Sequence, residues 1–103
     1  MNKNIKKPRH MEVYEAITSL ESLDECLKLF DDLLSVAELR AMEQRYQVAQ
    51  MLNEGMVYSA ILEKTGASSA TISRVNRSLQ NAGEGYRTVF ARMKAQKEEK
   101  GKK

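Results

Sequence analysis

Side chains that can perform catalysis or hold a metal ion are sparse in this sequence and are not grouped. The one histidine, His10, lies in a basic segment, and the one cysteine, Cys26, lies in an apolar helical pattern. A general base must be held beside its substrate, and a zinc site needs several Cys or His ligands at close spacing. Asp31 and Asp32 are adjacent on an expected helix and point in different directions. We therefore expect no enzymatic activity, no metal site and no cofactor.

Residues 58–79 offer a different chemistry, because they have the pattern of a helix-turn-helix. Gly66 interrupts one helical pattern and can take the positive φ of a tight turn. Ser68 or Ser69 can then cap a second helix. The pattern predicts a helix-turn-helix over about residues 58–81. The side chains expected to pack its two helices together are Ile61, Leu62, Ile72 and Val75.

The outward face of the second helix suits DNA. It begins with small side chains, so its N-terminal end can enter a major groove, which is about 12 Å wide. Hydroxyls and free backbone N–H groups at a helix start bind phosphates or base edges. The predicted DNA-binding residues are Ser68, Ser69, Ala70, Thr71, Ser73, Arg74 and Arg77. The alternative is a helix pair used only for packing.

Length, strand patterns and charge indicate the class of protein. A length of 103 residues predicts one domain. Alternating strand patterns are missing, so we expect an all-α fold. The formal net charge is +3. Basic ends flank an acidic middle, which favours a polyanionic partner. The single cysteine, the lack of a secretory signal and the lack of an apolar run of about 20 residues indicate a cytoplasmic protein without a membrane span.

Helical patterns fill the chain between its two ends. Residues 1–10 are expected to be a disordered basic arm, and residues 95–103 a frayed basic tail after a helix over about residues 85–94. Ser22 with Glu25, and Ser35 with Glu38, form capping-box patterns that start two helices. The helix after Ser22 has a broad apolar stripe, which predicts contacts on two sides. One side could face its own core and the other a partner subunit.

Three stretches of the chain are distinctive. They are F-D-D-L at residues 30–33, A-M-E-Q-R-Y-Q-V-A-Q-M-L at residues 41–52 and T-G-A-S-S-A-T-I-S-R-V at residues 65–75. Together they resemble the tryptophan repressor family. The whole of residues 11–94 is similar to the YerC/YecD-type branch of that family. The resemblance implies a six-helix, intertwined homodimer with a helix-turn-helix reading head at each end. It also implies a prokaryotic transcription factor that binds a near-palindromic operator with half-sites one DNA turn apart.

The resemblance also implies a possible effector pocket. Arg45 and Arg74 match the two arginines that enclose the ligand in the tryptophan repressor, and Ser35 and Ser78 match two residues that hold its amino-acid part. The family's glycine beside the second arginine is Val75 here, and its side chain is expected to fill the indole slot. We therefore expect no tryptophan binding, which leaves a different effector, or none, open. For Arg45 the alternative is a salt bridge within the dimer.

Together these features predict a homodimeric, sequence-specific DNA-binding regulator of transcription, which we expect to be a repressor. Its partners would be double-stranded DNA and a second copy of the chain. The alternative is a helical dimeric adaptor that contacts protein rather than DNA. Its docking surface would be the acidic face formed by Glu21, Asp24, Glu25, Asp31 and Asp32.

Overall fold

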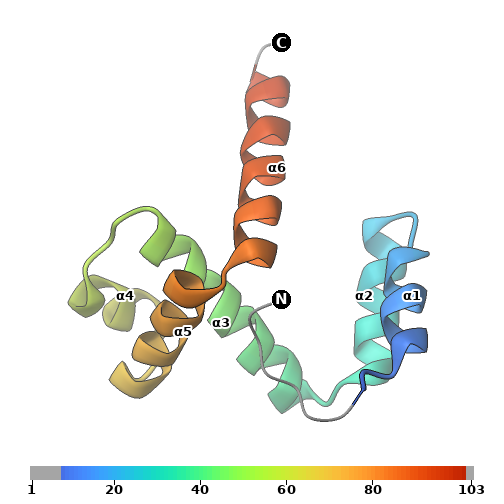
Figure 1. The fold of residues 1–103 in the computed structure, drawn as a ribbon, viewed down its shortest axis with the longest axis horizontal. Coiled ribbons are helices and arrows are strands. Elements are labelled where there is room, and N and C mark those ends of the chain that lie inside the picture. Colours follow the sequence, from blue (N-terminus) through green and yellow to red (C-terminus); the bar gives the residue numbers. More distant parts are fainter. Residues whose placement is uncertain (1–7, 102–103) are drawn as a thin grey trace. The chain divides into compact units, whose positions relative to one another are not determined.

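The computed structural model describes residues 8–101, and within this range the chain forms six helices and no strand (Figure 1). The helices are α1 (Met11–Thr18), α2 (Leu23–Leu33), α3 (Val36–Asn53), α4 (Tyr58–Thr65), α5 (Ser69–Asn81) and α6 (Glu84–Gly101). The predicted all-α class is therefore confirmed. None of the described helices combines the length and the apolar character needed to cross a membrane. The expected disorder of the basic arm falls, for residues 1–7, outside the described residues.

The described chain divides into two units, residues 8–43 and residues 44–101, and α3 begins in the first unit and ends in the second. The two predicted caps start α2 and α3. The Ser22 hydroxyl accepts a hydrogen bond from the backbone N–H of Glu25 at 3.1 Å. Ser35 and Glu38 form a reciprocal capping box, with backbone-to-side-chain hydrogen bonds of 3.2 and 2.8 Å. The hydrogen bond from the Ser35 backbone N–H, followed by that from its hydroxyl, lowers the pKa of Glu38.

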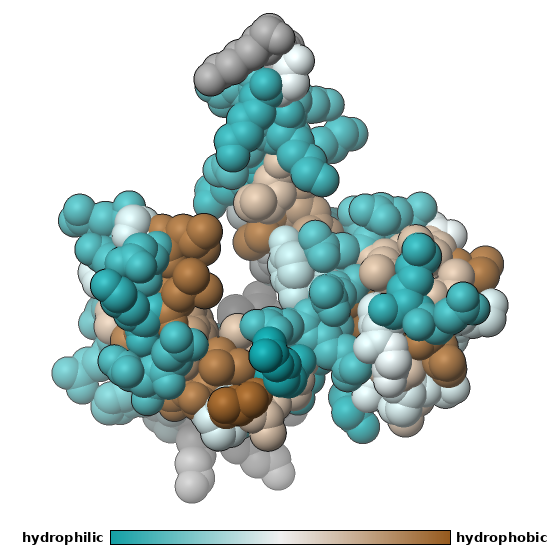
Figure 2. Space-filling view, turned by 180° about the vertical axis from the view of Figure 1, so that it is seen from behind, coloured by the Kyte–Doolittle hydropathy of each residue, from teal (hydrophilic) through white to brown (hydrophobic). Residues whose placement is uncertain are grey.

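The apolar side chains of the N-terminal unit remain open to solvent. No described residue from Pro8 to Glu43 is buried, and Leu23 and Val36 are 75% and 70% exposed. Figure 2 shows apolar residues gathered along one side of the N-terminal helices. Cys26, Leu27 and other apolar side chains line a groove of about 380 Å³ in this unit. Large exposed apolar surfaces in soluble proteins mark contacts with other molecules.

The C-terminal unit holds the buried core. Its members come from α3, α4, α5 and the turn between α4 and α5, and they are Val48, Ala49, Ile61, Ala67, Ile72 and Val75. The N-terminal part of α6 packs against this core through aromatic side chains. The Phe90 ring lies edge-on to Tyr46 of α3 at 5.6 Å and stacks on Tyr86 at 5.7 Å. The contact between Tyr46 and Phe90 attaches α6 to the C-terminal half of α3.

Helix α6 is longer than the sequence pattern predicted. It continues to Gly101, whereas the prediction ended it at Lys94 and treated the following residues as frayed. All of the residues from 91 to 101 are exposed, and the outer part of α6 is hydrophilic in Figure 2. The prediction was wrong because it required an apolar face. The segment A-Q-K-E-E-K consists of strong helix formers, which extend a helix that is already nucleated.

Candidate nucleic-acid interface

A three-residue turn joins α4 to α5 and sets their packing. Gly66 has φ +72°, the left-handed conformation that ends α4. Ala67, in the middle of the turn, is 2% exposed and belongs to the core. The Thr65 hydroxyl donates to the Ile61 carbonyl at 2.8 Å and accepts from the Ala67 N–H at 3.1 Å. The turn is thus fixed on both sides, and its geometry is consistent with the predicted helix-turn-helix.

The turn is also tied to α3. The side-chain amide of Gln44 donates a hydrogen bond to the Thr65 carbonyl at 3.2 Å, across 21 positions in sequence. That carbonyl lies at the end of α4, where backbone acceptors lack helical partners. Gln44 could not be predicted as part of the site, because nothing in the local sequence pattern places it beside the turn. Gln44 therefore supports the placement of the α4–α5 pair against α3.

The start of α5 has a hydroxyl cap. The Ser68 hydroxyl accepts from the backbone N–H of Thr71 at 3.1 Å and lies 3.0 Å from the Thr71 hydroxyl, to which it donates. Ser68, rather than Ser69, is therefore the cap. Ser69 and Ala70 follow it and are exposed. The first turn of α5 consequently presents small side chains beside backbone N–H groups at the positive end of the helix dipole.

Helix α5 has one buried face and one open face. Ile72, Val75 and Leu79 are 0%, 4% and 6% exposed. Their spacing of three and four residues places them on the same, buried side of the helix. Of the predicted DNA-binding residues, Ser68, Ser69, Ala70, Arg74 and Arg77 are exposed, and Thr71 and Ser73 are half-buried. Within α4 one predicted packing residue differs: Ile61 is buried, but Leu62 is 44% exposed. Adjacent helical residues point about 100° apart, so only one of the two can face the core.

The charge of this region favours an anionic partner. Residues 58–81 contain three basic side chains, Lys64, Arg74 and Arg77, against one acidic side chain, Glu63. All four of these residues are exposed. Arg74 and Arg77 lie on the open side of α5, one and two turns after Ala70. Small side chains followed by arginines can approach a phosphate backbone without a steric barrier.

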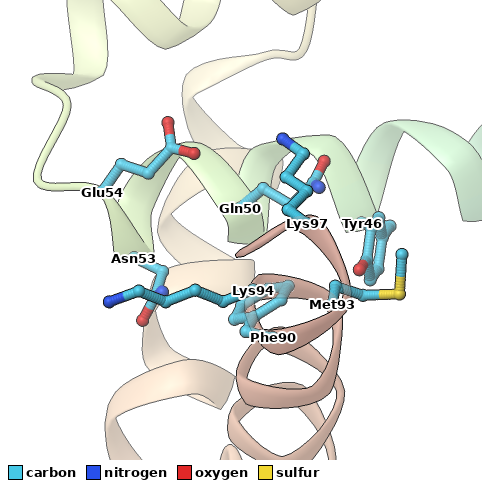
Figure 3. Close-up of a pocket in the computed structure, with 8 residues that line it drawn as sticks. All are labelled: Tyr46, Gln50, Asn53, Glu54, Phe90, Met93, Lys94 and Lys97. Carbon is cyan, nitrogen blue, oxygen red and sulfur yellow. The ribbon is translucent and has the colours of Figure 1, made fainter. Parts of the chain in front are cut away.

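The predicted effector residues are placed differently from one another. Val75 is buried in the core, whereas Arg45, Arg74 and Ser78 are exposed residues of the same C-terminal unit. Ser35 belongs to the N-terminal unit, where its hydroxyl and N–H are engaged in the cap with Glu38. None of the five lines the groove between α3 and α6 shown in Figure 3.

A second supporting residue that was not predicted from the sequence is Arg87, near the start of α6. Its guanidinium donates to the carbonyl of Leu79 at 3.1 Å and to that of Ala82. Both carbonyls lie at the end of α5. The only local signal is an arginine four residues after Gly83, which is too common a pattern to predict such a contact.

Comparisons with known proteins agree with this architecture. The family model described as Trp repressor protein matches residues 9–94. An uncharacterized Bacillus subtilis protein, YerC, is 41% identical over 92 residues, which cover 89% of this chain and 88% of that protein. A Staphylococcus aureus crystal structure, named as a candidate Trp repressor, has a TM-score of 0.77 and 46% identity, and covers 81% of this chain and 83% of its own. A TrpR-like protein from Eubacterium eligens has a TM-score of 0.77 and 49% identity, with 80% and 84% covered.

Proposed function

Because the chain belongs to the Trp repressor family, a family of DNA-binding regulators rather than enzymes, we propose that it is a sequence-specific repressor of transcription. The resemblance predicted from the sequence, including its YerC/YecD-type branch, is thereby confirmed. The observation that carries the proposal is the division of α5, with Ile72, Val75 and Leu79 buried and the small residues and arginines of its other side open. As a regulator of chromosomal genes it would act in the cytoplasm.

In the proposed complex the N-terminal end of α5 enters the major groove. Ser69, Ala70 and Ser73 would approach base edges, with Ala70 suited to contact a thymine methyl group. The Ser68 and Thr71 hydroxyls, already joined in the cap, would face the backbone together with the first N–H groups of α5. Arg74 and Arg77 would neutralise phosphates. Because the open face has no early Asn or Gln, readout would rely on bridging water and DNA shape.

The proposed active form is a homodimer. The exposed apolar side chains of the N-terminal unit, including Leu23 and Leu27, need a covering surface. The groove of about 480 Å³ between α3 and α6 offers one, since Tyr46, Phe90 and Met93 form its apolar part (Figure 3). Its rim is polar, with Lys94 and Lys97 on one side. We infer that an apolar helix of a second copy occupies this groove.

A homodimer has a simple signature in solution. Sedimentation equilibrium of the full chain is expected to give twice the 11.7 kDa mass of one chain. A twofold axis also predicts a near-palindromic operator whose half-sites lie one helical turn, or about 34–36 Å, apart. A stable monomer at micromolar concentration would contradict the dimer.

The effector part of the proposal is that tryptophan does not bind. Val75 is 4% exposed and packs in the core beside Ile72, so it occupies space at the position where the resembled family has a glycine. Another small effector, or none, is compatible with the exposed Arg45, Arg74 and Ser78. DNA reading by this protein would therefore be independent of tryptophan.

Selection of genomic DNA fragments by the purified protein tests the function. The selection is run with and without added amino acids, at moderate salt, and the bound fragments are sequenced. We expect enrichment of a near-palindrome close to promoters, followed by protection of both half-sites in footprinting. Enrichment without a shared motif, or no protected palindrome, would contradict a sequence-specific regulator.

A further inference from the structure

The C-terminal end of α5 is held by a side chain that takes no part in the predicted DNA face. Arg87, in the first turn of α6, donates from Nη1 to the Leu79 carbonyl at 3.1 Å and from Nη2 to the Ala82 carbonyl. One guanidinium thus spans the last turn of α5 and the residue that ends it. Leu79, whose carbonyl is bound, is itself a buried residue of the α5 core face.

This contact satisfies acceptors that a helix end leaves without helical partners. The backbone hydrogen bonds at the junction run from Ala82 N–H to the Ser78 carbonyl at 3.0 Å and from Arg87 N–H to the Gly83 carbonyl at 2.9 Å. The guanidinium donates hydrogen bonds to two further carbonyl acceptors, those of Leu79 and Ala82. A cation at a helix C-terminus also interacts favourably with the helix dipole, and hydrogen bonds from a charged donor are stronger than neutral ones.

Gly83 provides the room for the guanidinium. It has φ +66°, a conformation that favours glycine. A Cβ atom at this position would lie 2.8 Å from Nη1 of Arg87 and would overlap the carbonyl oxygen of Leu79. A side chain at residue 83 therefore cannot coexist with the present position of Arg87. Gly83, which has no side chain, and Arg87 therefore act together at the α5–α6 junction.

The helix that carries Arg87, α6, is fixed to the core. Tyr86 and Phe90, on either side of Arg87 in α6, pack against the buried cluster, and Phe90 contacts the Tyr46 ring of α3. Since α6 is anchored in this way, a rigid link from α6 to the end of α5 transmits that anchoring to α5. Without Arg87, only the backbone of Ala82 and Gly83 would connect the last turn of α5 directly to the start of α6.

We propose that Arg87 is a positioning residue, whose guanidinium bridges the Leu79 and Ala82 carbonyls and so fixes the orientation of α5, and of its DNA-reading face, relative to α6. The inference rests on the proposed DNA-binding function. Arg87 acts through α5 and makes no contact with DNA. This separates it from Arg74 and Arg77, whose proposed partners are phosphates.

The first experiment measures affinity of the full-length protein for its selected operator over a range of salt concentrations. The variants are Arg87→Met, which keeps the aliphatic stem, Arg87→Lys, and Arg92→Met as a control on an exposed arginine of the same helix. Arg87→Met removes both charge-assisted hydrogen bonds of the guanidinium and is expected to weaken operator binding at least about tenfold. The slope of log affinity against log salt is expected to stay unchanged, because no phosphate contact is removed. Arg87→Lys should recover part of the affinity, and Arg92→Met should bind like the unmodified protein.

The second experiment needs no DNA. Hydrogen exchange of the free protein is measured for backbone amides in the last turn of α5. These amides are expected to exchange faster in Arg87→Met than in the unmodified protein and in Arg92→Met, because the helix end opens more often. If Arg87→Met does not fold, Arg87→Lys supplies the comparison with the unmodified protein.

Two results would overturn the proposal. Unchanged affinity together with unchanged exchange in Arg87→Met would show that the link positions nothing. A salt slope reduced by about one would instead identify Arg87 as a phosphate contact. If the unmodified protein selects no operator, the proposed function fails by itself, and with it the role in DNA reading, while the exchange data still decide whether Arg87 holds the end of α5.

Discussion

Substituting Ser68 separates two tasks of the N-terminal end of α5, which are to cap the helix and to face DNA. Three substitutions divide these tasks. Ser68→Ala removes the hydroxyl that accepts from the Thr71 N–H at 3.1 Å. Ser68→Asn keeps a capping oxygen without adding charge. Ser68→Asp keeps the cap and adds one negative charge where a phosphate backbone is expected.

The magnitudes follow from these contacts. Loss of a serine cap lowers the free energy of unfolding by about 1 kcal/mol, which lowers the Tm of a domain of this size by about 4–8 °C. Ser68→Asn and Ser68→Asp should retain most of that stability. At about 7 Å from each of two phosphates, in a water-like dielectric, the aspartate charge opposes binding by about 1.2 kcal/mol in each head. Both heads of the proposed dimer carry the change, so the operator affinity should fall by about 2.4 kcal/mol, or roughly fiftyfold.

Thermal unfolding, followed by circular dichroism at one fixed chain concentration, measures the stability of each variant. Fluorescence anisotropy with the selected operator measures its affinity. Ser22 supplies a matched control, because its hydroxyl also accepts from an N–H three residues on, at 3.1 Å, but at the start of α2. Ser22→Ala should lower the Tm by a similar amount, and Ser22→Asp should leave operator affinity unchanged.

One outcome would refute the placement of α5 on DNA. If Ser68→Asp retains its Tm and binds the operator as tightly as the unmodified protein, the first turn of α5 does not face phosphates. If Ser68→Ala retains its Tm, the hydroxyl cap contributes nothing measurable and the structural reasoning about the helix start is wrong.

Three further predictions concern single sites. Arg74→Ala should reduce the salt slope by about 0.9 for each lost phosphate contact, measured by titration at several salt concentrations; an unchanged slope would place Arg74 away from phosphates. Calorimetry should find no saturable L-tryptophan site at sub-millimolar concentration, and a saturable site would contradict the reasoning from Val75. Glu38→Gln should destabilise the fold at pH 7, because the folded-state pKa of Glu38 lies below its ordinary value of 4.5. That difference should disappear as pH falls through the lowered pKa, and a difference that persisted in acid would contradict the proposed cause.

Most helix boundaries could be predicted because they depend on local chemistry. The capping patterns at Ser22 and Ser35 and the left-handed Gly66 lie where the structure begins or ends a helix. Predicted limits that differ by one residue, as at the start of α6, fall within the usual fraying of helix ends. The end of α6 was missed because a solvated helix needs only intrinsic propensity and a nucleus, and it leaves no apolar periodicity to detect.

The exposed side of α5 could be predicted from the sequence, but the side chains that hold α5 in place could not. Alternation of buried and open positions along α5 follows from helical periodicity, so the exposure of Ala70 and Arg74 could be anticipated. The two supports depend on residues far from the local pattern. Gln44 meets the turn from α3, and Arg87 meets the end of α5 from α6. Such side-chain-to-backbone contacts are fixed by tertiary placement, which no local spacing in the sequence encodes.

The most direct test of DNA reading by α5 compares two charge reversals in one operator-binding titration. Arg74→Glu lies on the open side of α5, and Asp31→Lys lies on the acidic face of α2 that would serve a protein adaptor. We predict that Arg74→Glu weakens operator binding about a hundredfold, because a dimer carries the change in both heads, and that Asp31→Lys binds normally. Normal operator binding by Arg74→Glu, with loss of function only in Asp31→Lys, would contradict DNA reading by α5.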